Sequence, residues 1–166
     1  MRRSYKFFML LLIALLTPVL IIVFLYIQDK MTVKDYAQEF YSHQLPQNTK
    51  ILDKGHNFGV FYGGGPWGSG GRPTMVAYMK LSTELSEKEV LDYYNNNNLS
   101  IETQNGIEVY FNEGREKKEK EGKVWYEGKS PLYASQDVNQ DNPIDLIIQV
   151  RTEFNPSMGE LASLIY

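Results

Sequence analysis

FFMLLLIALLTPVLIIVFLYI, residues 7–27, decides how the rest of the chain is arranged. The stretch contains no charged residue, and at a rise of about 1.5 Å per residue a helix of this length crosses a hydrocarbon core of about 30 Å. A cleaved signal peptide would have a shorter apolar core followed by small residues, and no such cleavage pattern follows here. We therefore expect an uncleaved transmembrane anchor.

The residues that flank the apolar run predict its orientation. The leader, residues 1–6, contains three basic residues, and an excess of Lys and Arg marks the cytoplasmic side of a membrane helix. Residues 28–166 are then expected outside, at a bacterial cell surface. Two other kinds of anchor are not favoured, because a lipoprotein needs a cysteine that the chain lacks and a pilin-type start needs an acid within the run.

The composition of the outer part indicates one acidic domain. It contains all 20 acidic residues and 14 of the 17 basic residues, since three belong to the leader, so its net charge is −6. This sign argues against a nucleic-acid partner and against a surface that binds anionic lipids. The absence of cysteine excludes disulfides and thiolate metal sites, so the fold must depend on an apolar core.

A helix is expected directly after the anchor, within residues 28–46. Apolar residues recur at helical spacing over 33–41, and Thr32 is placed as an N-cap. This juxtamembrane amphipathic helix either continues the membrane span or restarts after a break at Asp29 and Lys30. We expect its apolar face to pack on a sheet; a contact with the membrane surface or with a second copy is the alternative.

Residues 47–166 are predicted to form an α+β domain with a mainly antiparallel sheet and two or three helices. Alternating apolar residues over 144–150 predict a central strand, and Ser86 with Glu89 forms a capping box for a helix over 85–95. The charged run 113–123 is expected to be the solvated tip of a hairpin that joins the strands at 107–112 and 124–126. The remaining strands are expected at 50–52, 58–62, 75–81, 107–112, 124–126 and 132–135, and a closing helix from Ser157.

The most unusual segment of the domain is GGGPWGSGGRP, residues 63–73. Its six glycines and two prolines exclude regular structure and predict a long loop. A phosphate-binding loop would lead into a lysine and a helix, but a strand pattern follows, so nucleotide binding is not expected. Trp67 has the amphipathic side chain that binding sites use, and with Gly64, Gly65 and Arg72 it forms our candidate binding site. The alternative is that Trp67 folds back as a lid on the sheet.

Two further patterns suggest other chemistry. Asp137, Asn139 and Asp141 have the spacing that opens a calcium loop, but the glycine and the distal glutamate of such a loop are missing. A polar turn is the preferred interpretation, a metal site the alternative, and no cofactor is expected. Asp53 and His56 suit a general base with an orienting carboxylate, yet no nucleophile motif accompanies them.

The anchor and the lack of a complete catalytic motif together determine the expected function. We predict a non-enzymatic interaction module that is held at the membrane by residues 7–27 and contacts another envelope protein. The first alternative is a cell-wall glycan-binding module that uses exposed aromatic residues. The residues considered for such sugar stacking, although strand aromatics more commonly lie in a core, are Trp125, Tyr126, Tyr93, Tyr94, Tyr110 and Tyr133. The second is an enzyme that uses Asp53 and His56. Nucleic acids and nucleotides are not expected as partners.

Overall fold

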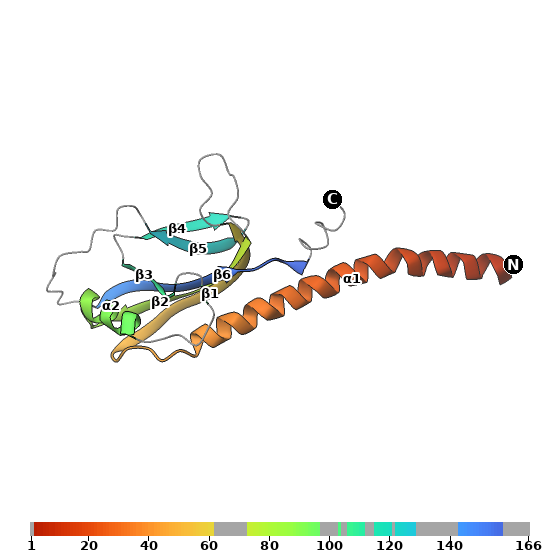
Figure 1. The fold of residues 1–166 in the computed structure, drawn as a ribbon. Helices are drawn as coiled ribbons and strands as arrows, with labels where there is room; N and C mark the ends of the chain where they lie inside the picture. The colour runs from red at the N-terminus through yellow and green to blue at the C-terminus, as the bar shows by residue number, and fades with distance from the viewer. Residues whose placement is uncertain are drawn as a thin grey trace.

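The chain has an α+β fold in which one long apolar helix leads into a small domain with antiparallel sheets (Figure 1). The structure is a computed structural model that describes residues 2–61, 73–96, 103, 106–111, 115–120, 122–128 and 143–157. The helix α1 (Arg2–Tyr41) extends far beyond the domain, with the N-terminus at its distant end. This arrangement confirms the expected fold class.

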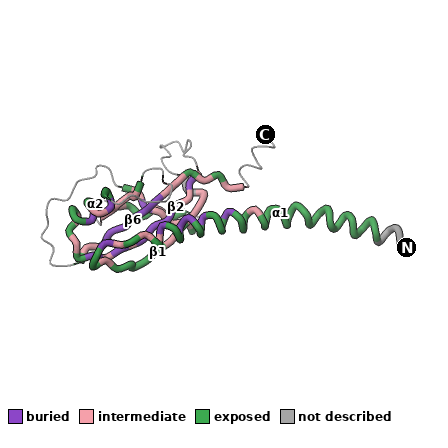
Figure 2. Tube along the Cα trace, turned by 60° about the horizontal axis from the view of Figure 1, so that its bottom comes forward, coloured by how far each residue is buried: buried purple, intermediate pink, exposed green. Residues whose placement is uncertain are grey.

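The first part of α1 has no protein neighbour in the described part of the chain. Its large apolar side chains between Phe7 and Phe24 are 45% to 70% exposed, as the uniform colour of this segment in Figure 2 shows. The helix is long and apolar enough to cross a membrane, which is consistent with an anchor. The expected N-cap at Thr32 is wrong, because α1 continues without a break and the Thr32 hydroxyl donates to the Gln28 carbonyl (3.1 Å).

The last turns of α1 belong to the core of the domain. Val33, Ala37 and Phe40 are at most 1% exposed, and Tyr36 on the same face is buried as well. These residues are spaced by three and four positions, so they form one helix face, and this face packs on the sheet as expected. The apolar run and the domain are therefore joined by continuous helix and not by a flexible linker.

Four antiparallel strands form the main sheet. Their order is β1 (Thr49–Phe61), β2 (Pro73–Thr83), β6 (Ile144–Glu153) and β3 (Glu108–Phe111). The central place expected for the strand at 144–150 is confirmed, since β6 lies between β2 and β3. Leu146, Ile148 and Val150 face the cluster that contains α1, whereas Ile147 faces the opposite side. The two short strands expected at 50–52 and 58–62 are parts of β1.

The helix α2 (Glu87–Asn96) covers the same face of the sheet as α1. Val90 and Tyr94 are buried in the same core cluster as α1. The expected capping box is confirmed: the Ser86 hydroxyl accepts from the Glu89 backbone N–H (3.3 Å), and the Glu89 carboxylate accepts from the Ser86 N–H (2.8 Å). These bonds pair backbone donors that the first turn of a helix leaves free.

A separate two-stranded sheet, β4 (Arg115–Lys120) with β5 (Lys123–Gly128), lies on the other face of the main sheet (Figure 1). The prediction for the charged run 113–123 is therefore wrong, because most of the run is β4 itself. The strand β3 pairs with β6 and not with β5. A charged strand is tolerated here because β5 contacts β1 and β2, while most of β4 stays exposed.

A buried polar network attaches this hairpin to the main sheet. Gln149 on β6 is fully buried, and its amide accepts from the Tyr126 N–H (3.0 Å) and donates to the Tyr126 carbonyl (3.0 Å). The same amide donates to the Glu108 carboxylate (2.9 Å), which also pairs with Arg151 (2.6 Å) and accepts from the Tyr110 hydroxyl (2.8 Å). Gln149 thus hydrogen-bonds both backbone groups of a β5 residue, as buried backbone polar groups require.

The chain after β6 returns to α1 near the end of the apolar run. Asp29 is 4% exposed and accepts hydrogen bonds from the backbone N–H (3.1 Å) and the hydroxyl (2.6 Å) of Ser157. Residue 157 is helical, as expected for the start of the closing helix. The rest of that helix, 158–166, and the strand expected at 132–135 lie outside the described residues.

Candidate functional site

The binding and metal sites expected from the sequence lie outside the part of the chain that the structure describes. The residues concerned are Trp67, Gly64, Gly65 and Arg72 of the glycine-rich loop, and Asp137, Asn139 and Asp141 of the calcium-like pattern. Both sites stay predictions. Among the described residues, no three His, Asp or Glu side chains come together as a metal ion would require.

Asp53 and His56 are both described, and the fold separates them. The pairing of β1 with β2 is regular between these two positions, so their odd spacing puts them on opposite faces of the strand. The Asp53 carboxylate accepts from the backbone N–H of Lys54 (2.8 Å). Partial loss of hydration, and secondly the charge of Lys34, lower the pKa of His56. A base with an orienting carboxylate needs direct contact between the two groups, which this arrangement does not provide.

The aromatic residues considered for sugar stacking do not share one face. Tyr94 is buried in the cluster on the α1 side of the sheet, together with the partly buried Tyr93. Tyr126 and Tyr110 pack on the opposite side, beneath the hairpin. These four tyrosines therefore contribute to the two cores, as aromatic residues in strands commonly do.

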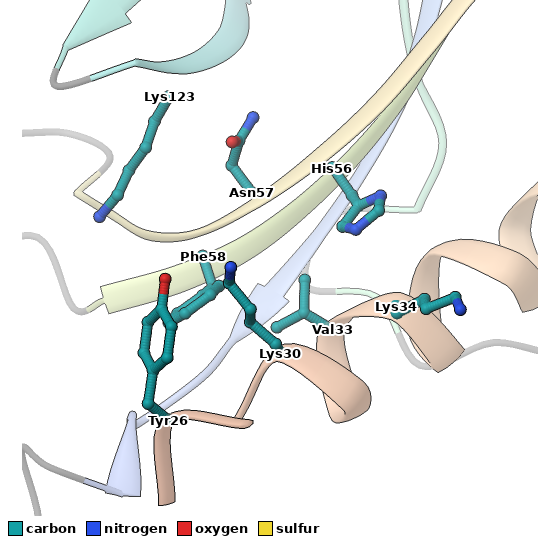
Figure 3. Close-up of a pocket in the computed structure, with 8 residues that line it drawn as sticks. All are labelled: Tyr26, Lys30, Val33, Lys34, His56, Asn57, Phe58 and Lys123. Carbon is teal, nitrogen blue, oxygen red and sulfur yellow. The ribbon is translucent and has the colours of Figure 1, made fainter. Parts of the chain in front are cut away.

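A cleft of about 510 Å³ lies between α1 and β1, at the end of the domain that faces the apolar run (Figure 3). Among the described residues, the cleft is lined by three lysines, one histidine, two aromatic rings, one amide and one valine, and by no acid. The lining residues are Tyr26, Lys30, Val33 and Lys34 of α1, His56, Asn57 and Phe58 of β1, and Lys123 of β5. We refer to it as the basic cleft.

Two aromatic rings hold two of the lysines in place. The rings of Tyr26 and Phe58 are neighbours, with 6.3 Å between their centroids. The ammonium of Lys30 lies 4.8 Å from the centroid of Tyr26, and the ammonium of Lys123 lies 5.9 Å from that of Phe58. A ring attracts a cation without neutralising it. The two charges thus approach the cleft from different elements and keep their capacity to bind an anion.

The positions of these residues follow from their local structure. Tyr26, Lys30 and Lys34 are spaced by four residues, which places them on the same face of α1. Lys123 begins β5, and the neighbouring residue of that strand is fixed to β1 because the Asn57 amide donates to the Val124 carbonyl (2.7 Å). The Lys123 ammonium also reaches the Gly59 carbonyl, at 3.4 Å.

The positive charge of the basic cleft is not compensated by acids in the part of the chain that the structure describes. The ion pairs found there are Lys80–Asp145, Lys117–Glu119, Lys118–Glu116 and Arg151–Glu108, none of which involves a residue of the cleft. Asp29 is adjacent to Lys30 in sequence, but its carboxylate bonds Ser157. An acidic domain thus has one locally basic surface.

Sequence reasoning missed the basic cleft. The four-residue spacing of Tyr26, Lys30 and Lys34 was a detectable signal for a basic helix face next to the apolar run. The contributions of Phe58 and Lys123 had no such signal, because β1 and β5 are far apart in the chain and meet only through the fold.

No protein-family model, curated protein or solved structure matches the chain. Its function is therefore inferred from its own residues and their geometry.

Proposed function

We propose that the chain is a non-enzymatic single-pass membrane protein whose leader is cytoplasmic and whose α+β domain is an extracytoplasmic interaction module. The observation that best supports this proposal is the continuity of α1. The same helix exposes its apolar side chains before Phe24 and buries Ala37 and Phe40 in the domain. A domain joined in this way is held close to the membrane surface in a restricted orientation.

The partner we propose is another component of the envelope, with an envelope protein as the first choice. A binding role is supported by the basic cleft, where cations and aromatic rings converge without the acid partner that a general base would need. The loop that contains Trp67 remains the contact predicted from the sequence. Binding of cell-wall glycan is the alternative, and the placement of the described aromatic residues does not favour it.

The orientation can be tested with single cysteines, because the chain has none of its own. Ser4→Cys lies in the leader, and Ser42→Cys is exposed just after α1. On intact cells, a membrane-impermeant maleimide should label Ser42→Cys at once and Ser4→Cys only after permeabilisation. The reverse pattern would show that the domain is cytoplasmic and would refute the proposal.

The contact can be tested by the fluorescence of Trp67 in a Trp125→Phe background. The full chain is reconstituted in nanodiscs and titrated with an envelope-protein fraction or with purified cell-wall glycan, and iodide quenching is measured. Protection of Trp67 by one fraction supports the loop as the contact and identifies the class of partner. If Trp67 is already protected from iodide in buffer, it is a structural lid, and the loop is no longer the proposed contact.

A further inference from the structure

We propose that the basic cleft binds the phosphate-bearing headgroup of an anionic phospholipid from the same membrane that α1 spans. This inference rests on the proposed function, because only a chain anchored through residues 7–27 brings the cleft to a lipid surface. It extends that function by naming a ligand class for the basic cleft, as the described residues line it.

The position of the cleft along α1 matches the headgroup layer. Lys30 lies three residues beyond Ile27 and Lys34 seven, which is about 4.5 Å and about 10 Å along the helix axis. The polar layer on each side of a bilayer is about 5–8 Å thick. Lys30 therefore lies within the headgroup layer, and Lys34 lies a few ångströms beyond it, within the reach of a lysine side chain. Tyr26 falls where aromatic side chains of membrane proteins are enriched.

The lining of the cleft matches the chemistry of such a headgroup. Figure 3 shows the side chains of Tyr26 and Lys30 from α1 beside Phe58 of β1, with Lys123 approaching from β5. Ammonium groups make short, charge-assisted hydrogen bonds to phosphate oxygens. Phe58, which is partly exposed, provides apolar surface for the glycerol and the first methylenes.

The net charge of −6 of the outer domain argued against a lipid-binding surface, but net charge averages over the whole molecule. At physiological ionic strength, charges are screened beyond about 8–10 Å, so a headgroup responds to the side chains around it. Among the described residues, Lys30, Lys34, Lys123 and His56 line the cleft and no acid does. The Asp29 carboxylate, next to Lys30 in sequence and bonded to Ser157, offsets at most one of the three lysine charges. Local charge therefore favours an anionic ligand despite the overall sign.

The test measures lipid binding to the full chain in a neutral detergent by native mass spectrometry, with phosphatidylglycerol or phosphatidylcholine added. We expect the wild-type chain to bind phosphatidylglycerol more tightly. A lysine at an anionic lipid surface contributes about fivefold in affinity, so Lys30→Gln/Lys123→Gln should weaken phosphatidylglycerol binding about 25-fold. Lys50→Gln/Lys88→Gln removes the same charge from exposed positions outside the cleft and should have no effect. Circular dichroism verifies that both variants fold.

Equal affinity for the two lipids, or equal weakening by both double variants, would overturn the proposal. Soluble glycerol phosphate is tested separately in detergent without added lipid. If it binds the wild-type chain as tightly as phosphatidylglycerol does, the site recognises free phosphate, and the headgroup assignment is wrong.

Carbonate extraction of cell membranes separates this inference from the proposed function. If the chain resists extraction but shows no lipid preference, the lipid site is refuted and the proposed membrane anchor is retained. A chain that is extracted would refute the anchor, and the lipid site with it.

Discussion

Gln149→Leu tests the inference that hydrogen bonds, more than apolar contact, hold the β4–β5 hairpin on the main sheet. Gln149 is fully buried and makes two bonds of 3.0 Å with the backbone of Tyr126 and one of 2.9 Å with Glu108. Leucine has nearly the volume of glutamine, so the substitution removes the amide without opening a large cavity. It removes the two hydrogen bonds that the Tyr126 N–H and carbonyl make with the Gln149 amide.

The magnitude follows from these two lost bonds. A buried backbone group that loses its hydrogen bond costs about 1–3 kcal/mol, so the two bonds of Tyr126 account for about 4 kcal/mol together. Burial of the leucine side chain offsets about 2 kcal/mol of this. We therefore expect the free energy of unfolding to fall by about 2 kcal/mol, and by more if the Glu108 carboxylate also loses stabilisation.

The assay is guanidinium denaturation of the full chain in detergent micelles, in a Trp67→Phe background. Trp125 is then the reporter for the hairpin, and far-UV circular dichroism reports the helices. The control is Gln38→Leu, the same chemical change at an exposed position of α1, which should stay within about 0.5 kcal/mol of the parent. The reasoning is refuted if Gln149→Leu is as stable as this control.

Three further outcomes are expected. Gly55→Ala should destabilise the domain by about 1–3 kcal/mol in denaturant titrations, because its Cβ would lie 2.6 Å from the hydroxyl oxygen of the buried Tyr78. Asp29→Asn should speed hydrogen exchange at the Ser157 amide about tenfold, since the amide loses a carboxylate acceptor at 3.1 Å. Burial raises the pKa of Tyr94 above 10, so its contribution to stability is complete below pH 10 and is lost as the pH rises above it. Tyr94→Phe should therefore reduce the alkaline loss of stability, measured by denaturation on both sides of pH 10.

Each of these predictions can fail clearly. If the clash with Tyr78 is the cause, Gly55→Ala should lower the free energy of unfolding less in a Tyr78→Leu background than in the parent. Strictly additive effects of the two substitutions would contradict this explanation. Asp35→Asn, on the exposed side of α1, should leave hydrogen exchange at the Ser157 amide unchanged. If it speeds exchange as much as Asp29→Asn does, the loss of a negative charge on α1 is the cause and the hydrogen bond is not. If the free energy of unfolding falls equally above pH 10 in Tyr94→Phe and in the parent, ionisation of Tyr94 does not cause the alkaline loss of stability.

The features that the sequence predicted correctly are those with a short-range physical signature. The apolar run identifies a helix that can span a membrane by length and composition alone. The spacing of Val33, Ala37 and Phe40 defines a buried helix face, and the Ser86–Glu89 pair starts α2 through bonds that span three residues. The alternation of apolar residues over 144–150 predicted a strand, and β6 is found there, with residues of both its faces buried.

The errors have a common cause. In both cases tertiary packing overrides the local signal. Charge in the run 113–123 predicted a solvated tip, but most of the run forms β4, a strand that stays largely exposed. Its partner β5 makes the contacts with the main sheet. Thr32 was interpreted as a cap because its type suits one, while the packing of the following turns on the sheet keeps the helix continuous.

The sequence by itself determined the long apolar helix, the amphipathic face that follows it, the α+β class and the acidic net charge, because each depends on residue type and local spacing. The tertiary structure decided the strand order, the burial of Gln149 between two sheets, the separation of Asp53 from His56 and the assembly of the basic cleft. Lys30 and Lys123 are 93 positions apart in the chain. No local pattern relates such residues, since only the packing of α1 and β5 against β1 brings their charges to one surface.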